Sequence, residues 1–374
     1  MKYRLKPTKA QTTQLDTQLE ECRWTYNHLL AQRRDAWEER QESLSYYAQA
    51  TMLPALKQER PALSGVHSQV LQNVAVRIDL AFKAFFRRVK TGEDEPGYPR
   101  FRGYGRYDSM TFPQYGNGCT MVDGVLKLSK VGAVRIIEHR PLEGTPKTCT
   151  VRRASTGKWY ATIACEVETQ PMAPTGESVG IDVGLISFAT LSTGEATLCP
   201  KFFRQDEHDL KRTQRKLSAA TKGTPERAKR RTIVGRVHER IANRRTNFAH
   251  QESRTLVNRF DVIAVEDLSV NQMVHNHCLA KSIHDAAWSQ FATFVSYKAA
   301  CAGRAFVAVN PAYTSQDCSR CGHRQKKTLA ERVHACGCCG LVLDRDHNAA
   351  LNIKRLGLQA LGLVPRSSGL QAGE

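Results

Sequence analysis

Two pairs of cysteines near the end of the sequence have the spacing of a metal site. Thiolates in two Cys-x-x-Cys pairs close a tetrahedral zinc site, because each pair turns two sulfurs toward one ion. Fourteen residues separate the pairs, whose members are Cys318, Cys321, Cys336 and Cys339. We therefore expect one structural zinc ion in a zinc ribbon over residues 313–343. Cys338 is an alternative fourth ligand, although Cys339 gives the regular spacing and is followed by a glycine.

Three acidic residues stand in matching local settings. Asp182 and Glu266 each end an apolar run typical of a buried strand, and Asp346 begins a helical pattern. They lie 84 and 80 residues apart, so only tertiary structure can gather them. Side chains at the ends of neighbouring strands converge in an α/β sheet. Clustered carboxylates repel unless cations lie between them, and oxygen ligands favour Mg²⁺. Two Mg²⁺ ions about 4 Å apart would support phosphodiester hydrolysis.

Each acid taken alone has a more ordinary interpretation, since an Asp after an apolar strand is usually a cap or turn residue. A strand followed by Asp-x-Gly, as in Asp182–Gly184, also opens the nucleotide-binding domains of actin-like ATPases and sugar kinases. That fold requires a second Asp-x-Gly hairpin for phosphate, and the sequence has no convincing one. The nuclease interpretation is therefore favoured over the kinase one.

The composition favours a polyanionic partner. The chain has 374 residues with 55 Lys+Arg against 36 Asp+Glu, a net charge of +19 and a pI near 9.6. Such an excess points to nucleic acid before membrane, and a merely basic solvated surface is the alternative. There is no apolar run of about 18 residues, and the N-terminus lacks the apolar core of a signal peptide. We expect no membrane partner and a cytoplasmic, nucleoid-associated protein.

Basic and aromatic residues of the N-terminal half are candidate nucleic-acid contacts. A helical stripe from Leu71 to Val89 has a basic opposite side, and the loop after it interleaves aromatics with arginines. Such a loop can stack on bases while it pairs with phosphates. The candidates are Arg77, Lys83, Arg87, Arg88, Tyr98, Arg100, Phe101 and Arg102.

Periodicity divides the chain into two parts. The first has a strand at 2–6, helices from residue 9, and strands between 110 and 170; a linker follows at 170–176. The second alternates apolar strands with helices, and contains a densely basic helical segment, 201–250, with fifteen Lys/Arg against five Asp/Glu. In this part we expect strands at 178–185, 186–191, 261–268 and 305–309, a helical break near 223–225, and helices at 285–301 and 346–356.

Several motifs together resemble one known family. They are VGIDVGLISFAT, IAVEDLSV, KSIHDAAWSQF, the paired cysteines and DRDHNAALNI, with KYRLKPTKAQ, RWTYNHLL, LQNVAVRIDLAFKAFF and GYPRFR near the N-terminus. In this order they resemble the transposon-encoded TnpB proteins, compact relatives of type V CRISPR effectors. The resemblance covers nearly the whole chain except its tail.

The resemblance implies a multidomain α+β fold. Residues 1–7 and 105–172 would form a wedge-like β-barrel, with a helical recognition insert at 8–104. An RNase H-like, RuvC-type α/β nuclease domain would take 177–312 and 344–356, with the zinc ribbon inserted at 313–343. Residues 357–374 would be a disordered tail.

The resemblance also implies an activity, an RNA-guided DNA endonuclease that cleaves target DNA next to a short flanking motif. Its metal-binding acids would be Asp182, Glu266 and Asp346, with Asp346 preferred to Asp344, and Arg332 would lie near the scissile phosphate. The partners would be a guide RNA from the transposon end and double-stranded DNA, in a monomeric ribonucleoprotein. The alternatives are an RNA-guided repressor that does not cut, and a transposase accessory protein.

Overall fold

The computed structural model describes residues 1–328 and 331–364, and the chain divides into two compact units, Met1–Glu168 and Thr169–Glu374. Each unit has its own hydrophobic core. Within the described residues, no helix is both long enough and apolar enough to span a bilayer. The last ten residues of the expected tail, 365–374, lie outside the described residues.

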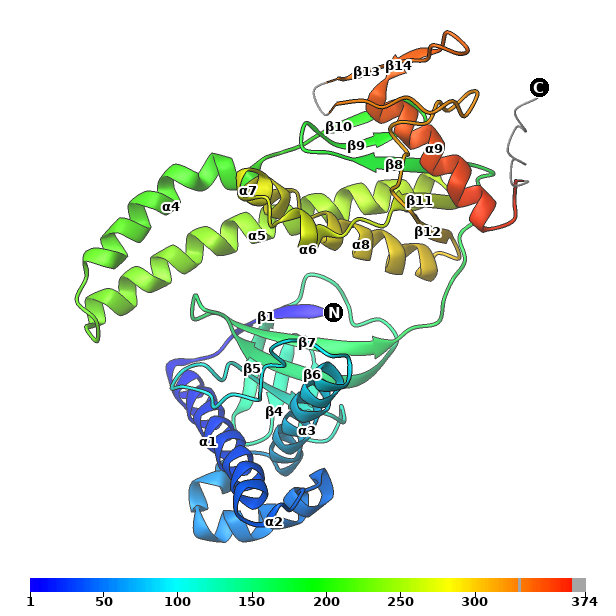
Figure 1. The fold of residues 1–374 in the computed structure, drawn as a ribbon. Coiled ribbons are helices and arrows are strands. Elements are labelled where there is room, and N and C mark those ends of the chain that lie inside the picture. The colour runs from blue at the N-terminus through cyan, green and yellow to red at the C-terminus, as the bar shows by residue number, and fades with distance from the viewer. Residues whose placement is uncertain (329–330, 365–374) are drawn as a thin grey trace. The chain divides into compact units, whose positions relative to one another are not determined.

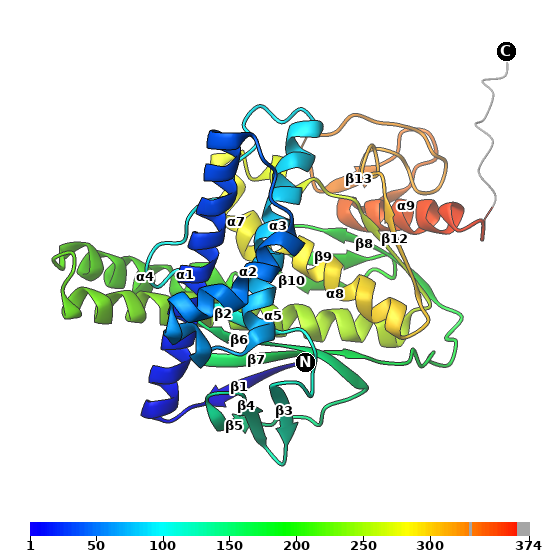
Figure 2. The same ribbon diagram turned by 90° about the horizontal axis from the view of Figure 1, so that it is seen from below.

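The first unit is built on a seven-stranded antiparallel sheet with the order β2-β6-β7-β1-β5-β4-β3 (Figures 1 and 2). Strand β1 pairs with β7 on one side and β5 on the other, so the N-terminal strand completes a sheet made mostly of residues beyond 108. In the described residues the edge strands β2 and β3 do not pair with each other, so the nearly closed sheet is not a complete barrel. Its strands are β1 Lys2–Lys6, β2 Ser109–Phe112, β3 Cys119–Val122, β4 Val125–Leu128, β5 Gly132–Ile137, β6 Thr145–Arg153 and β7 Trp159–Glu166.

Helices α1 Lys9–Arg40, α2 Tyr46–Glu59, η1 Pro61–Gly65 and α3 Ser68–Lys90 complete the first unit. Helix α1 begins with a capping box between Thr8 and Gln11, which satisfies two of the free amides of its first turn. The predicted stripe of α3 is buried as far as Phe82. Val89 is 48% exposed, so its placement on that buried stripe was wrong, because the last turns of α3 extend beyond the core.

The second unit contains a five-stranded sheet with the order β10-β9-β8-β11-β12 (Figure 1). Strands β8, β11 and β12 are parallel, whereas β9 and β10 are antiparallel to their neighbours. The bounds are β8 Ser178–Val183, β9 Ser187–Leu191, β10 Ala196–Leu198, β11 Val262–Glu266 and β12 Ala305–Val309.

Helices cover both faces of this sheet. On one face, Ile181 and Val265 pack with residues of α5 Pro225–Arg259 and α8 Trp288–Cys301. On the other face, α9 Arg345–Ala360 crosses β8 and β11, and its Ile353 packs with Ala264. Alternate residues of a strand point to opposite faces, so the apolar runs are buried on both sides.

Two glycines allow α9 to approach the sheet closely. A Cβ at Gly180 would lie 2.1 Å from the carbonyl oxygen of Ala350, and one at Gly357 would lie 2.4 Å from the Cβ of Ala264. The sequence predicted an end of this helix at about Leu356, but it continues to Ala360. The glycine at 357 is a contact residue inside the helix, and so the expected start of the tail at 357 was wrong.

A helical hairpin connects β10 to β11. Helix α4 Phe202–Ala219 and helix α5 are separated at Ala220–Thr224, which confirms the predicted break. The predicted helix at 285–301 was wrong at its start, because α7 His277–Ala286 and α8 are separate helices. Ala287 adopts a left-handed conformation between them, with a φ of 55°. A short helix, α6 Val270–Met273, precedes α7, and the two-stranded sheet of β13 Val333–Ala335 and β14 Val342–Asp344 leads into α9.

Candidate active site and metal-binding site

Asp182 and Glu266 lie on neighbouring parallel strands. Strand β8 pairs with β11 in a register that sets Ile181 opposite Val265, so the next residues, the two acids, are at the same level near the carboxyl ends. By alternation they share the face of Gly180 and face α9. Asp346 stands in the first turn of α9. The close approach of α9 to Gly180 therefore brings the third acid toward the other two.

The other two carboxylates are close enough to Asp182 to affect its protonation. Burial raises the pKa of Asp182 to about 8, and the charges of Glu266 and Asp346 contribute to the rise. Burial also raises the pKa of Glu266. The three acids do not form one tight group, since the four thiols described below are the only set of three or more His, Cys, Asp or Glu ligand atoms within 4.8 Å of one another in the described residues. A divalent cation bound between carboxylates would offset their repulsion.

The two aspartates of Asp344-Arg345-Asp346 have different surroundings. The Asp344 carboxylate caps α9 and accepts hydrogen bonds from the backbone amides of Asp346, at 2.9 Å, and His347, at 3.1 Å. The Asp346 carboxylate faces cations instead, with Arg345 Nη2 at 3.3 Å and Arg332 Nη1 at 3.8 Å. The capping bonds fix the start of the helix and thus the position of Asp346.

Sequence reasoning missed the residues that hold Glu266 in place. The Thr314 hydroxyl donates a hydrogen bond of 2.5 Å to Glu266 Oε1, and Thr314 is only 4% exposed. The Asn352 side chain in turn donates to the Thr314 carbonyl at 2.9 Å, and Asn348 donates to the Asp317 carbonyl at 2.8 Å. Both asparagines are buried. The sequence did contain a signal for these contacts. The two asparagines stand at i and i+4 on the apolar side of a helix, and buried amides must have hydrogen-bond partners.

If the acids form the nuclease site that the sequence predicts, replacing Thr314 by valine should lower the rate of DNA cleavage about tenfold, the lower end of the range for residues that orient metal ligands. Valine keeps the shape but cannot donate to Glu266, so the carboxylate loses its fixed orientation. We expect the Mg²⁺ concentration at half-maximal rate to rise, while the melting temperature stays close to that of the wild type. Ser315→Ala is the neighbouring control. An unchanged Mg²⁺ dependence would show that Thr314 does not position Glu266.

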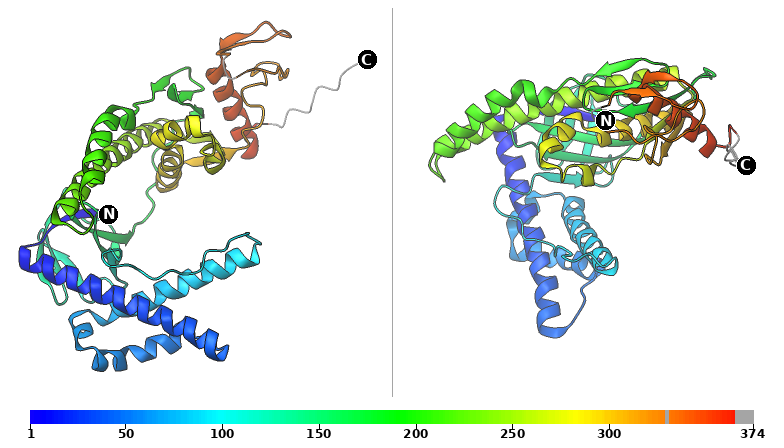
Figure 3. Two further views of the ribbon diagram at one scale, coloured as in Figure 1. Left: turned by 60° about the vertical axis from the view of Figure 1, so that its left-hand side comes forward. Right: turned by 45° about the horizontal axis from the view of Figure 1, so that its top comes forward.

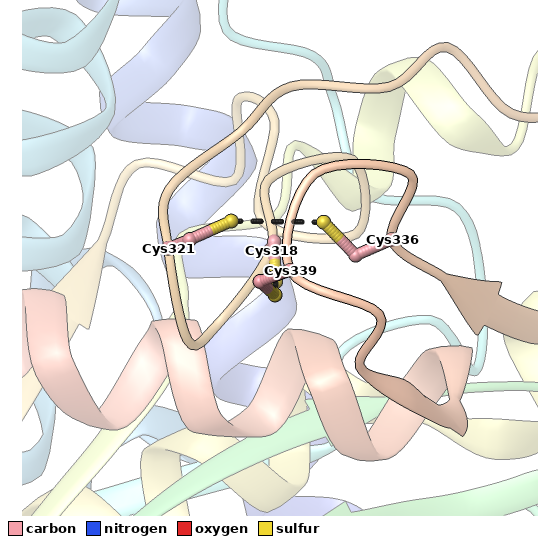
Figure 4. A group of neighbouring side chains, drawn as sticks. All are labelled: Cys318, Cys321, Cys336 and Cys339. Atoms are coloured by element: carbon pink, nitrogen blue, oxygen red, sulfur yellow. Dashed lines mark hydrogen bonds between the residues drawn. The ribbon is translucent and has the colours of Figure 1, made fainter.

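Four thiols converge in the segment before α9 (Figure 4). The Sγ atoms of Cys318 and Cys339 are 3.6 Å apart, as are those of Cys321 and Cys336. A tetrahedral zinc ion with Zn–S bonds of about 2.3 Å requires sulfurs about 3.8 Å apart, so this set fits zinc. The structure leaves Cys338 exposed and outside the set. Amides of Cys339 and Cys338 donate toward Cys336 and lower the pKa of its thiol. A backbone amide also lowers the pKa of Cys339, but burial and hydrogen bonds with the neighbouring thiols raise it overall. A bound metal ion would favour the thiolate form of all four.

The candidate nucleic-acid contacts of the first unit have diverse environments. The Arg77 guanidinium donates to Ser109 and Thr111, so it attaches α3 to β2. The Tyr98 ring packs edge-on against Phe82 and Phe85 and is still 44% exposed.

The remaining candidates face solvent at least in part. Lys83 pairs with Asp79 at 2.9 Å, and Arg88 donates to the Gly97 carbonyl at 2.7 Å. Phe101 is 48% exposed and lies under the Arg34 guanidinium. Arg87, Arg100 and Arg102 are exposed.

Two cavities flank the acids. One, of about 320 Å³, lies beside Asp346 and is also lined by Arg332, His347 and Thr190. Thr190 pairs with Asp182 across β8 and β9, so this cavity adjoins the acidic face of the sheet. The other, of about 460 Å³, begins at Glu266 and extends over the α8 face past Trp288 and Tyr297.

Three family models match parts of this chain. The family model described as "Probable transposase" matches residues 162–277, that of the "Cas12f1-like, TNB domain" matches 288–353, and a "Helix-turn-helix domain" model matches 1–42. In this structure residues 1–42 form β1 and the single helix α1, not two helices. The fold is that of a solved Cas12f1 chain, from a complex with single-guide RNA and target DNA. The TM-score is 0.58 at 15% identity, over 92% of this chain and 82% of that one.

Two relatives match along almost their whole length. A Streptomyces pristinaespiralis protein named "Putative RNA-guided DNA endonuclease" is 37% identical, over 100% of this chain and 93% of its own. The Escherichia coli K12 protein named "Putative RNA-guided DNA endonuclease InsQ" is 30% identical, over 95% of this chain and 91% of its own. The chain therefore belongs to the TnpB family, which confirms the resemblance of its motifs.

Proposed function

We propose that this protein is an RNA-guided DNA endonuclease that hydrolyses phosphodiester bonds at Asp182, Glu266 and Asp346. The observation that carries the proposal is the approach of these acids, 84 and 80 residues apart in sequence, at one face of a sheet. Full-length relatives bearing the name of such an enzyme support it.

The donor set fits Mg²⁺. Three carboxylates offer oxygen ligands, and two arginines lie beside one of them, Asp346. Burial and the charges of Glu266 and Asp346 raise the pKa of Asp182. Bound there, two Mg²⁺ ions would supply Lewis-acid activation of water and stabilisation of the leaving oxygen. Thr314 orients Glu266, and the Asp344 cap orients the first turn of α9.

Arg332 is the candidate contact for the scissile phosphate. Its guanidinium lies 3.8 Å from Asp346, is 47% exposed and lines the 320 Å³ cavity beside the acids. A phosphate entering this cavity would meet a cation on one side and the carboxylates on the other. Arginine suits this role, because its planar guanidinium can bind two phosphate oxygens.

The finer architecture is part of the proposal. The sheet of β8–β12 with α9 would be the RuvC-type, RNase H-like nuclease domain, at 177–312 and 344–356. The four-cysteine segment, 313–343, would be a zinc ribbon inserted into it. The nearly closed sheet, at 1–7 and 105–172, would be the wedge-like barrel, and 8–104 its helical recognition insert. The bond between Thr314 and Glu266 supports a structural link from the ribbon to the site.

The test uses the full chain assembled with its guide RNA. Sequencing the RNA that copurifies with the protein identifies the guide, and a library of flanking sequences beside a matched target identifies the flanking motif. We expect double-stranded DNA to be cut in Mg²⁺, and not in EDTA or with an unmatched target. Binding of the target without cutting would instead favour an RNA-guided repressor.

A transposase accessory role is the remaining alternative, consistent with the description of one matching family model. Strand transfer would produce joined DNA products rather than cut ends. Gel analysis of the same reactions separates the two outcomes.

A further inference from the structure

The α4–α5 hairpin projects from the sheet of the second unit (Figures 1 and 3). Near the sheet, α4 and α5 are held together by a small apolar cluster around Leu210, Val237 and Ile241. Residues 211–231, here called the hairpin tip, lie beyond Leu210 and contain the turn between the helices. The turn is well defined, because the Arg227 guanidinium donates to the carbonyls of Leu217 and Ala220 and the Thr224 side chain caps α5.

Charge is distributed unevenly along the hairpin. Near the sheet, arginines have carboxylate partners: Arg240 pairs with Asp206 at 2.6 Å, and Arg245 pairs with Asp285 at 3.0 Å. The tip has nine Lys/Arg and one acid, Glu226. Among the described residues, five exposed cations of the tip have no hydrogen-bond or ion-pair partner, namely Arg215, Lys216, Lys222, Lys229 and Arg231. Cations so close together repel each other unless an anionic partner lies against them.

The composition of the tip indicates which feature of a nucleic acid it would contact. Residues 211–231 contain no Phe, Tyr or Trp, so the tip lacks the aromatic platforms that bind unpaired bases. Lysines and arginines on two antiparallel helices instead suit the phosphates of a base-paired segment.

We propose that the hairpin tip binds the sugar–phosphate backbone of a base-paired segment of the guide RNA. This inference rests on the proposed function. Helix α4 rises about 1.5 Å per residue, so its 18 residues carry the tip about 27 Å from the start of the hairpin. The DNA strand to be cut must reach the acids at the sheet. A contact so far along the hairpin suits the guide RNA, which does not have to enter the site.

The test is the affinity of the full chain for its guide RNA, measured without DNA at several salt concentrations. The variant Arg215→Gln/Lys216→Gln/Lys222→Gln/Lys229→Gln removes four cations. We expect RNA affinity to fall about tenfold to a hundredfold near physiological salt. The slope of log K against log[salt] should become shallower by about three to four, since each of the four phosphate contacts contributes about 0.7 to 0.9.

Two control variants separate charge from structure. Gln214→Ala/Ser218→Ala/Thr221→Ala changes exposed neutral positions of the same tip and should bind RNA normally. Arg215→Lys/Lys216→Arg/Lys222→Arg/Lys229→Arg keeps every charge and should also bind normally. A loss of affinity in this charge-preserving variant would overturn the proposal, as would unchanged RNA affinity in the glutamine variant.

A parallel measurement of target DNA binding shows whether the hairpin tip contacts RNA or DNA. If the glutamine variant binds guide RNA normally and its complex binds target DNA weakly, the tip contacts DNA and the assignment to RNA is wrong. Failure of the wild-type complex to cut any target would overturn the nuclease function, whereas normal cutting with unchanged RNA affinity in the variant would overturn the hairpin assignment alone.

Discussion

Replacing Asp182 by asparagine should reduce DNA cleavage by at least a thousandfold. The expected loss is about 4 kcal/mol of transition-state stabilisation, because the amide removes one of the charges proposed to bind the two Mg²⁺ ions. Guide RNA binding and target binding should remain, since the residue lies at the sheet and not on a basic surface. Single-turnover cleavage and a binding assay on the same preparation measure both quantities.

The same substitution should stabilise the metal-free protein at alkaline pH. The folded-state pKa of Asp182 is about 8, above its ordinary value near 4, so the folded protein binds this proton more tightly than the unfolded chain. The wild type should therefore lose stability as pH rises from about 4 to about 8, and Mg²⁺ should restore it. Asp182→Asn should show a smaller loss, because the raised pKa of Glu266 remains, and it should melt a few degrees higher than the wild type at pH 8 in EDTA.

Asp94→Asn is the matched control for Asp182→Asn, because it makes the same charge change at an exposed position of the first unit. It should leave cleavage and the pH dependence of melting unchanged. Full cleavage by the Asp182 variant would remove the basis of the proposed mechanism. A wild-type melting temperature that does not respond to Mg²⁺ would argue that the acids bind no cation in the folded protein.

Replacing Cys318 by serine should release zinc and destabilise the segment that leads into α9. Structural zinc sites in small finger peptides have binding free energies of roughly 10–16 kcal/mol at pH 7. The loss of one thiolate should weaken binding enough for the zinc content to fall from about one ion per chain to well below half an ion per chain. Cleavage should fall as well, because this segment contains Arg332 and holds Thr314 against Glu266.

Cys338→Ser supplies the control for the zinc site, since Cys338 lies in the same segment but is exposed and outside the thiol set. Its zinc content, melting temperature and activity should match the wild type. Retention of zinc by Cys318→Ser together with its loss from Cys338→Ser would show that the fourth ligand and the geometry have been misassigned.

Local patterns in the sequence predicted most of the elements that surround the acids. The apolar strands ending at Asp182 and Glu266, the break between α4 and α5, and the N-terminal strand all follow from residue periodicity and turn residues. The spacing of the cysteines likewise predicted which thiols lie together, because two Cys-x-x-Cys pairs leave few other ways to group four ligands.

The length of α9 and the identity of the fourth thiol depended on tertiary contacts, which sequence periodicity does not predict. Gly357 had the local appearance of a helix stop, yet α9 passes it because the missing side chain admits Ala264. The choice between Cys338 and Cys339 also required coordinates, since both stand within one short turn.

The sequence by itself determined which side chains could do chemistry: three acids, two cysteine pairs and a basic helical segment. Tertiary structure decided how they combine. Parallel pairing of β8 with β11 sets two acids at one level, and the close packing of α9 on Gly180 adds the third. The hydrogen bond from Thr314 to Glu266 joins the four-cysteine segment to that group. The physical reason is that register and close packing join residues far apart in the chain, whereas periodicity reports only neighbours.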